Sequence, residues 1–256
     1  MTLTATFHDL KGASVLITGG GSGIGAALTR GFVQQGARVA FIDLADATDF
    51  AAGLAAEYGN APLFLQGDVT DTALLQNLIA QAAEAHGPIS VLVNNVANDQ
   101  RHTLADTTPE DWDQVQAVNI KSYFFATQAV APAMRARGKG AIVNFSSISY
   151  MMGNAGYPAY AAANAGITGL TRSLARELGT DGIRVNAIAP GWVLTQKQLD
   201  MWATPEDLAA HLARQCLKEH LVPEDMVDAV LFLSSDSSRM MTGQCMPVDG
   251  GVVVTG

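Results

Sequence analysis

The chain has 256 residues, of which 48% are hydrophobic and 15% are charged. This much apolar sequence can form a large core, which excludes an intrinsically disordered protein. The formal net charge is -9, from 24 acidic and 15 basic side chains. Proteins that bind nucleic acid concentrate Lys and Arg, so we expect no nucleic-acid partner.

The two cysteines, Cys216 and Cys245, match neither the spacing of a metal site nor a disulfide framework. We therefore expect no metal ion and reduced thiols, as in a cytoplasmic protein. The segment from Met1 to Leu10 lacks the basic and apolar regions of a signal peptide, and no window reaches about 18 uninterrupted apolar residues. A membrane partner is not expected either.

Short apolar runs alternate with helical patterns along the chain. The predicted strands are 14–18, 38–42, 63–66, 90–93, 141–145, 184–188 and 244–248. The predicted helices are 24–33, 50–58, 73–85, 109–137 and 158–179, with one more after Pro205 and another from Pro223. Such an alternation indicates parallel strands joined by helical crossovers, with helices on both faces of the sheet.

The segment from about 190 to 220 is less regular, and long connections of this kind are usually functional. No low-complexity linker and no internal repeat interrupts the alternation of strand and helix. We therefore predict an α/β fold with a single domain over residues 1–256. It would be a Rossmann-type, doubly wound parallel sheet of about seven strands, with a substrate lid at about 190–220.

A glycine-rich turn, Thr18-Gly19-Gly20-Gly21-Ser22-Gly23-Ile24-Gly25, joins the first strand to the first helix. Gly19 permits the tight turn, Gly23 lets the backbone approach a pyrophosphate, and Gly25 allows close packing of the helix on the sheet. The N–H groups at the start of the helix can then bind the anion. Glycines also form ordinary turns, but the strand before and the helix after favour a dinucleotide site. The predicted contacts are Gly19, Ser22, Gly23, Ile24 and Gly25.

Polar residues also follow the next strands. Asp43 ends the second strand, where a carboxylate can accept hydrogen bonds from the adenosine ribose and repel a 2′-phosphate. This favours NAD over NADP, although Asp43 could instead cap the following helix. We expect Asp68 and Val69 to flank the adenine, and Asn95 to close the adenosine side of the site.

Motifs spread over the whole chain share a characteristic spacing: Thr18-Gly-x-x-x-Gly-x-Gly25, Asn94-Asn95, Asn119, Ser147, Tyr160, and Pro190-Gly191 with Thr195. The combination resembles the short-chain dehydrogenase/reductase family over essentially the whole chain. The resemblance implies a seven-stranded parallel sheet that carries NAD(P), and a catalytic group of Ser, Tyr, Lys and Asn. It also implies cofactor contacts from Gly191, Val193 and Thr195, the last of these with the nicotinamide carboxamide.

The resemblance assigns the catalytic roles. Hydride transfer needs a base for the hydroxyl proton and a donor that holds the oxygen. Tyr160 matches the base, Ser147 the donor to the substrate oxygen, and Asn119 the proton relay. A phenol has an ordinary pKa of about 10, so it must be acidified by a nearby positive charge to act near neutral pH.

The family pattern Tyr-x-x-x-Lys is broken, because this chain has Asn164 four residues after Tyr160. That spacing places both side chains on one helical face, where a lysine would contact the nicotinamide ribose and lower the pKa of the tyrosine. Asn164 can still bind the ribose but supplies no charge. No lysine occurs between Lys139 and Lys197. An inactivating change, compensation by another cation and a cofactor-binding protein without turnover all remain open.

Other segments resemble the family's sugar dehydrogenases, which oxidise free aldoses such as xylose at C1. They are Asn98-Asp99-Gln100-Arg101-His102, Trp202-x-Thr204-Pro205-Glu206 and Gln215-Cys216-Leu217-Lys218. A polar loop can also be merely solvated, and both tryptophans of the lid could simply anchor it. The predicted substrate contacts are Asn98, His102, Asn154, Trp192 and Trp202.

The leading hypothesis is an NAD-dependent oxidoreductase that transfers hydride between a sugar hydroxyl and NAD. The most concrete form is oxidation of an aldose at C1 to its lactone, because an anomeric hydroxyl is more acidic than an ordinary alcohol and depends less on the base. A secondary-alcohol or 3-ketoacyl reductase and a catalytically weak or inactive NAD(H)-binding protein are the alternatives. The resemblance further implies a homotetramer, formed through helices 109–137 and 158–179.

Overall fold

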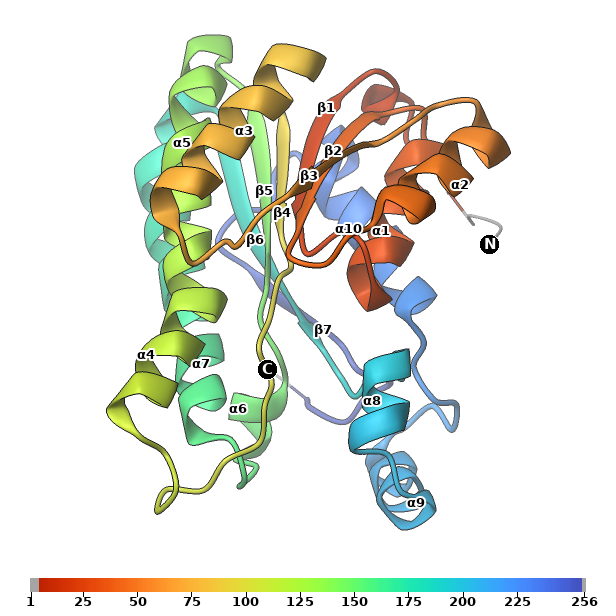
Figure 1. The fold of residues 1–256 in the computed structure, drawn as a ribbon, viewed down its shortest axis with the longest axis vertical. Helices are drawn as coiled ribbons and strands as arrows, with labels where there is room; N and C mark the ends of the chain where they lie inside the picture. The colour runs from red at the N-terminus through yellow and green to blue at the C-terminus, as the bar shows by residue number, and fades with distance from the viewer. Residues whose placement is uncertain (1–4, 255–256) are drawn as a thin grey trace.

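The computed structural model describes residues 5–254 and contains a seven-stranded parallel sheet with helices on both faces (Figure 1). The strand order is β3-β2-β1-β4-β5-β6-β7. The strands are β1 Ser14–Thr18, β2 Arg38–Asp43, β3 Leu63–Gln66, β4 Val91–Asn94, β5 Gly140–Phe145, β6 Ile183–Pro190 and β7 Cys245–Val248. The predicted α/β fold and its doubly wound parallel sheet are thus confirmed.

Two separate hydrophobic cores cover the two faces of the sheet. In β1, Val15 and Ile17 belong to the core formed with α1, α2 and α10, whereas Leu16 belongs to the core with α3, α5 and α7. Side chains alternate between the faces of a strand, so a strand covered on both sides is apolar throughout. All five residues of β1 are accordingly buried. The helices are α1 Gly23–Gln34, α2 Thr48–Tyr58, α3 Thr72–His86, α4 Pro109–Gln116, α5 Ser122–Arg137, α6 Ser149–Met152, α7 Pro158–Leu178, α8 Gln196–Met201, α9 Pro205–Arg214 and α10 Val227–Ser234.

The prediction of one continuous α-helix over residues 109–137 is wrong in one respect. A π-helical turn at Ala117–Lys121 separates α4 from α5. Such a turn inserts an extra residue without ending the helix, and it often occurs at functional sites. Likewise, the helix expected from Pro223 begins with a 3-10 turn at Pro223–Met226, and α10 starts only at Val227.

The segment 190–220 contains α8 and α9, which lie beyond one end of the sheet (Figure 1). An isolated parallel bridge pairs Val193 with Leu221, so the segment leaves and rejoins the body of the fold at one place. Within residues 5–254, no helix combines the length and the apolar character needed to cross a membrane.

Candidate active site

A cavity of about 790 Å³ opens at the carboxyl ends of the strands. Its walls come from the glycine-rich turn, from the segments that follow β4, β5 and β6, and from α7, α8 and α9. The strand order changes direction between β1 and β4. Doubly wound sheets bind their ligands in the crevice at this switch point.

Most of the predicted site residues line this one cavity. They are Gly19, Ser22, Gly23, Ile24, Gly25, Asp43, Asn95, Ser147, Asn154, Tyr160, Asn164, Gly191, Trp192, Val193 and Thr195. The predicted residues that do not line it are Asp68, Val69, Asn98, His102, Asn119 and Trp202. The fold therefore brings together side chains from distant parts of the chain, but six predicted residues do not line the cavity.

The glycine-rich turn requires its glycines for steric reasons. Gly19 and Gly23 have φ angles of +69° and +51°, a region that L side chains rarely adopt. A Cβ on Gly25 would lie 1.7 Å from the carbonyl oxygen of Gly19. The turn therefore stays tight, and α1 begins at Gly23 with its N–H groups beside the cavity, an arrangement suited to a phosphate.

The carboxylate of Asp43 is fixed against this turn. Its Oδ2 accepts a hydrogen bond of 2.8 Å from the N–H of Gly21, and its Oδ1 accepts one of 3.3 Å from Ala45. Helix α2 begins at Thr48 after the N-cap Ala47, which makes no side-chain cap bond. Asp43 is therefore not the cap of the following helix, and its position on the cavity wall fits the cofactor role.

The residues expected on the adenine side divide into two groups. Asn95 donates from Nδ2 to the carbonyl oxygens of Thr18 and Gly19, at 3.1 and 2.9 Å, and so holds the glycine-rich turn in place. The Asp68 carboxylate instead accepts hydrogen bonds from the backbone and hydroxyl of Thr70. Val69 is buried in the core. The Asp68 side chain thus shapes the approach to α3.

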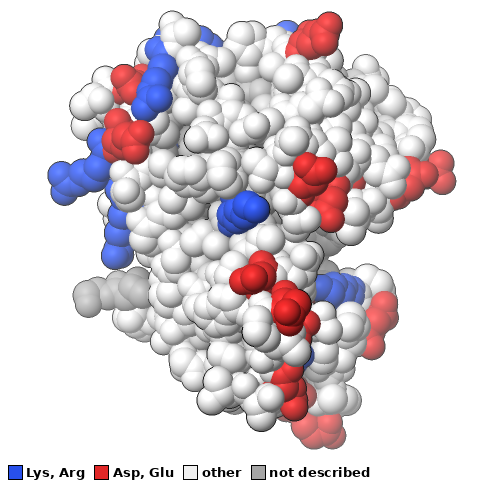
Figure 2. Space-filling view, turned by 60° about the vertical axis from the view of Figure 1, so that its left-hand side comes forward, with Lys and Arg blue, Asp and Glu red and all other residues white. Residues whose placement is uncertain are grey.

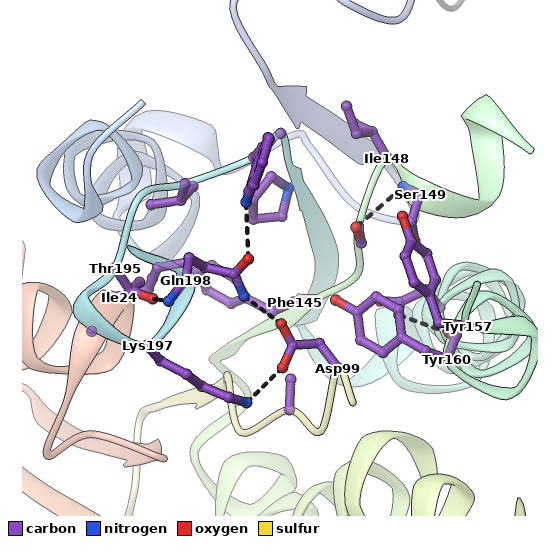
Figure 3. Close-up of a pocket in the computed structure, with 18 of the residues that line it drawn as sticks. Ile24, Asp99, Phe145, Ile148, Ser149, Tyr157, Tyr160, Thr195, Lys197 and Gln198 are labelled. Atoms are coloured by element: carbon purple, nitrogen blue, oxygen red, sulfur yellow. Dashed lines mark hydrogen bonds and ion pairs between the residues drawn. The ribbon is translucent and has the colours of Figure 1, made fainter. Parts of the chain in front are cut away.

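Tyr160 lies near the start of α7, and its ring is directed toward the space beside Asp99 (Figure 3). Burial and the negative charge of Asp99 raise the pKa of the phenol to about 12, although hydrogen bonding with Ser147 and Asn164 acts in the opposite direction. The charge acting on the phenol is therefore opposite in sign to that of the family lysine. At neutral pH Tyr160 is protonated and can donate a hydrogen bond.

Asn164, at the position where the family pattern predicts a lysine, is a buried amide. Its Nδ2 donates a hydrogen bond of 2.9 Å to the carbonyl oxygen of Tyr160, one helical turn earlier. The backbone carbonyl oxygen of Asn164 accepts a hydrogen bond of 2.9 Å from the hydroxyl of Ser146. The Ser146 hydroxyl, next to Ser147, is therefore bonded to the backbone of α7. Asn164 is tied into the helix and contributes no charge to the site.

Asn119 lies in the π-helical turn and is only 1% exposed. Its Oδ1 accepts a hydrogen bond of 2.9 Å from the N–H of Asn98, and its Nδ2 donates to the carbonyl oxygens of Asn98 and Val115. Both backbone groups of Asn98 are thus paired with one side chain. This explains why an amide stands among apolar neighbours in a helix: it fixes the loop that follows β4.

His102 positions the start of α7. Its Nε2 accepts a hydrogen bond of 3.2 Å from the N–H of Ala159, the residue before Tyr160. Trp202 stacks with the guanidinium of Arg101, whose carbon lies 5.0 Å from a ring centroid. These two predicted substrate residues therefore support the cavity wall from outside.

Two other predicted substrate residues line the cavity. Trp192 donates from Nε1 to Oε1 of Gln198 at 2.9 Å. Asn154 donates from Nδ2 to the hydroxyl of Tyr157 at 3.0 Å. The flat ring of Trp192 and the amide group of Asn154 therefore lie on walls contributed by different segments of the chain.

Sequence reasoning missed a polar network around Asp99. Its Oδ1 accepts a hydrogen bond of 2.6 Å from Nζ of Lys197, and its Oδ2 accepts one from Nε2 of Gln198 (Figure 3). The network joins the loop after β4 to α8, and it continues through Gln198 to Trp192. The only sequence signal was the position of Asp99 inside the sugar-type motif, because nothing in the sequence pairs it with residues almost 100 positions away.

Comparison with known proteins defines the family. A short-chain dehydrogenase model, described as "Enoyl-(Acyl carrier protein) reductase", matches residues 19–253. The chain belongs to the short-chain dehydrogenase/reductase family and is an oxidoreductase. It is 49% identical over 255 residues to "Probable galactose dehydrogenase GalD" of Rhizobium meliloti, covering 98% of this chain and 100% of the relative. It is 48% identical over 248 residues to "D-xylose 1-dehydrogenase" of Caulobacter vibrioides, covering 97% and 98%.

Solved structures support the same conclusion. The fold is similar to that of a "putative gluconate dehydrogenase" from Agrobacterium tumefaciens, with a TM-score of 0.91 and 31% sequence identity. The match covers 98% of this chain and 100% of the other. The family resemblance stated from the sequence motifs is therefore confirmed.

Proposed function

We propose that this protein is an NAD-dependent aldose 1-dehydrogenase, which oxidises the C1 hydroxyl of a free sugar to a lactone. One observation carries the proposal. The Tyr160 side chain, a carboxylate at Asp99 and amides at Asn154 and Gln198 all line the cavity that the glycine-rich turn opens into. Relatives named as galactose and D-xylose dehydrogenases agree with such a polar site.

The cofactor half of the cavity supports NAD. The turn at Gly19–Gly25 would hold the pyrophosphate, and Asn164 and Thr195 would face the nicotinamide side. Asp43 would accept hydrogen bonds from the adenosine ribose, and its charge would repel a 2′-phosphate. When bound, the nicotinamide supplies a hydride acceptor.

The substrate half supports a polyhydroxylated ligand. Asn154 and Gln198 offer amide groups from opposite walls, and Trp192 offers a flat apolar surface of the kind that packs on a sugar ring. Ser147 and Tyr160 would donate hydrogen bonds to the C1 oxygen as it acquires carbonyl character. Donation suits a tyrosine whose pKa is raised to about 12.

The organisation of the chain is also part of the proposal. Residues 1–256 would form one domain, and the segment 190–220 would act as a lid. Figure 2 shows the face brought forward from the left of Figure 1, where α4, α5 and α7 lie; uncharged surface surrounds scattered basic and acidic side chains there. Trp112 and Phe124 are 42% and 41% exposed on α4 and α5. These two exposed aromatic side chains support a homotetramer assembled through these helices, and a cytoplasmic location remains a prediction from the sequence.

A protein that binds NAD(H) without turnover is the second candidate, because Asn164 removes the positive charge beside Tyr160. A panel assay separates the alternatives. The protein is incubated with NAD or NADP and with aldoses, secondary alcohols and, in the reverse direction, 3-ketoacyl thioesters. We expect NADH formation with aldoses and little activity with NADP. Preference for the alcohols or thioesters, or cofactor binding with no turnover at any pH, would contradict the proposal.

A further inference from the structure

We propose that Asp99 is the proton acceptor of the reaction in this chain, and that Tyr160 acts as a protonated hydrogen-bond donor. The inference rests on the proposed oxidation of a hydroxyl group. It changes the role that the family resemblance assigns to Tyr160. It also gives a function to a carboxylate to which the sequence motifs assign no role.

The first argument concerns the phenol. With its pKa raised to about 12, Tyr160 is protonated at pH 7. The family lysine, which would correct this, is replaced by Asn164, whose amide is bonded to the backbone of α7. A carboxylate, by contrast, is ionised at neutral pH. If Tyr160 were the base, the negative charge of Asp99 beside it would disfavour the phenolate that the reaction needs.

The second argument is the placement of Asp99. Its carboxylate lines the cavity between α8 and the ring of Tyr160 (Figure 3). Lys197 and Gln198 each donate one hydrogen bond, one to each oxygen. A carboxylate has about four acceptor positions, so positions remain for a substrate hydroxyl. The side chain is 26% exposed, which gives the proton a path to solvent.

The third argument is rigidity. The preceding residue, Asn98, has both backbone groups paired with the buried side chain of Asn119. Lys197 and Gln198 hold the carboxylate itself from α8. Of the ionisable groups that face it, Lys197 pairs with its Oδ1, and Tyr160 lies close enough for the charge of Asp99 to act on the phenol. The acceptor is therefore held in place by contacts from two segments of the chain.

The chemical step balances. The C1–H bond breaks, and its electron pair leaves as hydride to the oxidised nicotinamide cofactor. The O–H bond at C1 breaks, and its proton forms a new O–H bond on the Asp99 carboxylate. The electron pair left on the oxygen by the broken O–H bond at C1 completes the C1–O double bond of the lactone. Tyr160 and Ser147 donate hydrogen bonds to this oxygen. The hydroxyl becomes strongly acidic as the hydride leaves, so a carboxylate is a sufficient base.

The test compares four variants with the wild type on whichever hydroxyl compound the protein oxidises. Asp99→Asn keeps the shape but cannot accept a proton, and Asp99→Ala leaves space for an added carboxylate. Tyr160→Phe removes the phenol. Asp106→Asn is the matched control, because Asp106 is an exposed carboxylate of the same loop that bonds Thr103 and does not line the cavity. The measurements are kcat and KM over pH 6 to 10, with and without formate, and the Kd of NADH.

We expect Asp99→Asn to lower kcat by at least about 100-fold at every pH, with the Kd of NADH changed less than about twofold. Formate should restore part of the activity of Asp99→Ala, which a structural loss would not allow. Tyr160→Phe should lower kcat without changing the shape of the pH profile, and Asp106→Asn should match the wild type.

Three results would overturn the inference. Asp99→Asn could keep or exceed the wild-type kcat with a profile moved to lower pH, which would show that Tyr160 phenolate is the base and that Asp99 merely opposes it. Asp99→Asn could raise KM alone, or formate could fail to rescue Asp99→Ala, either of which would show a binding role.

A wild type that oxidises only non-sugar alcohols would contradict the sugar proposal, while the same variants would still test Asp99 on those substrates.

Discussion

The two halves of the cavity differ in how closely they follow the family pattern. On the cofactor side, the turn from Gly19 to Gly25 and the carboxylate of Asp43 keep the geometry that the pattern requires. On the substrate side, Asn164 stands where the family pattern predicts a lysine, and the charge that acts on Tyr160 is the negative charge of Asp99.

This difference separates two kinds of dependence. Dinucleotide binding relies on backbone shape, which the glycines and Asn95 enforce by close contact. Proton transfer relies on a charge of the right sign near the reacting oxygen, and such a charge can come from another segment once the fold has brought it there. On the proposed mechanism, a chain retains the geometry of the glycine-rich turn while its acid–base chemistry moves from one residue to another.

The largest effect is expected in the cofactor half. Gly25→Ala places a Cβ 1.7 Å from the carbonyl oxygen of Gly19, so the turn must open. We expect the Kd of NADH to rise by at least about 100-fold, measured by fluorescence titration. Gly53→Ala is the control, since a Cβ there meets nothing within 4 Å and the residue lies in α2. Tight binding by Gly25→Ala would break the claim that backbone shape controls this half.

A smaller change is expected from the ribose carboxylate. Asp43→Ser keeps an acceptor for the N–H of Gly21 but removes the charge that would repel a 2′-phosphate. The ratio of kcat/KM for NAD to that for NADP should fall on the order of 30-fold, or about 2 kcal/mol. Asp46→Ser serves as the control, because Asp46 is an exposed carboxylate that bonds Thr48. An unchanged ratio for Asp43→Ser would remove Asp43 from the cofactor site.

The smallest effect sharpens the comparison in the substrate half. Asn164→Lys should lower the pKa of Tyr160, because a positive charge favours the phenolate. The phenol of Tyr160 is protonated below its present pKa of about 12. A lower pKa would let the phenolate form at a lower pH than it does now. The phenolate would then act as a second proton acceptor beside Asp99, so we expect kcat to show a new rise of about tenfold over the pH range where the phenol ionises, and no gain at a pH where it stays protonated. Asn164→Gln, which adds length without charge, should leave the profile in place. A profile unchanged by the lysine would contradict the charge argument.

The sequence predicted the fold and the tight glycine-rich turn well, because both depend on local patterns. Apolar runs such as Val15–Ile17 mark buried parallel strands, and the glycines mark the turn directly. The π-helical turn around Asn119 was not predicted, because an inserted residue leaves the hydrophobic pattern of a helix almost unchanged.

The substrate side was harder to predict because its contacts are long-range. His102 and Trp202 have the residue types of sugar contacts, yet the fold uses them to support α7 and the Arg101 side chain. Asp99 acquires its role only when α8 brings Lys197 and Gln198 against it. The sequence could show that a positive charge was missing beside Tyr160, but it could not show which charged group the fold places there.

The central claim, oxidation of an aldose at C1, is tested most directly by isotope transfer. The protein is incubated with NAD and with D-xylose or D-galactose carrying deuterium at C1, and the reduced cofactor and the sugar product are analysed by mass spectrometry. We predict that the deuterium appears in the reduced cofactor and that the product is the unlabelled aldonolactone. Deuterium retained in the sugar product while NADH forms would place the oxidation at another carbon and contradict the account.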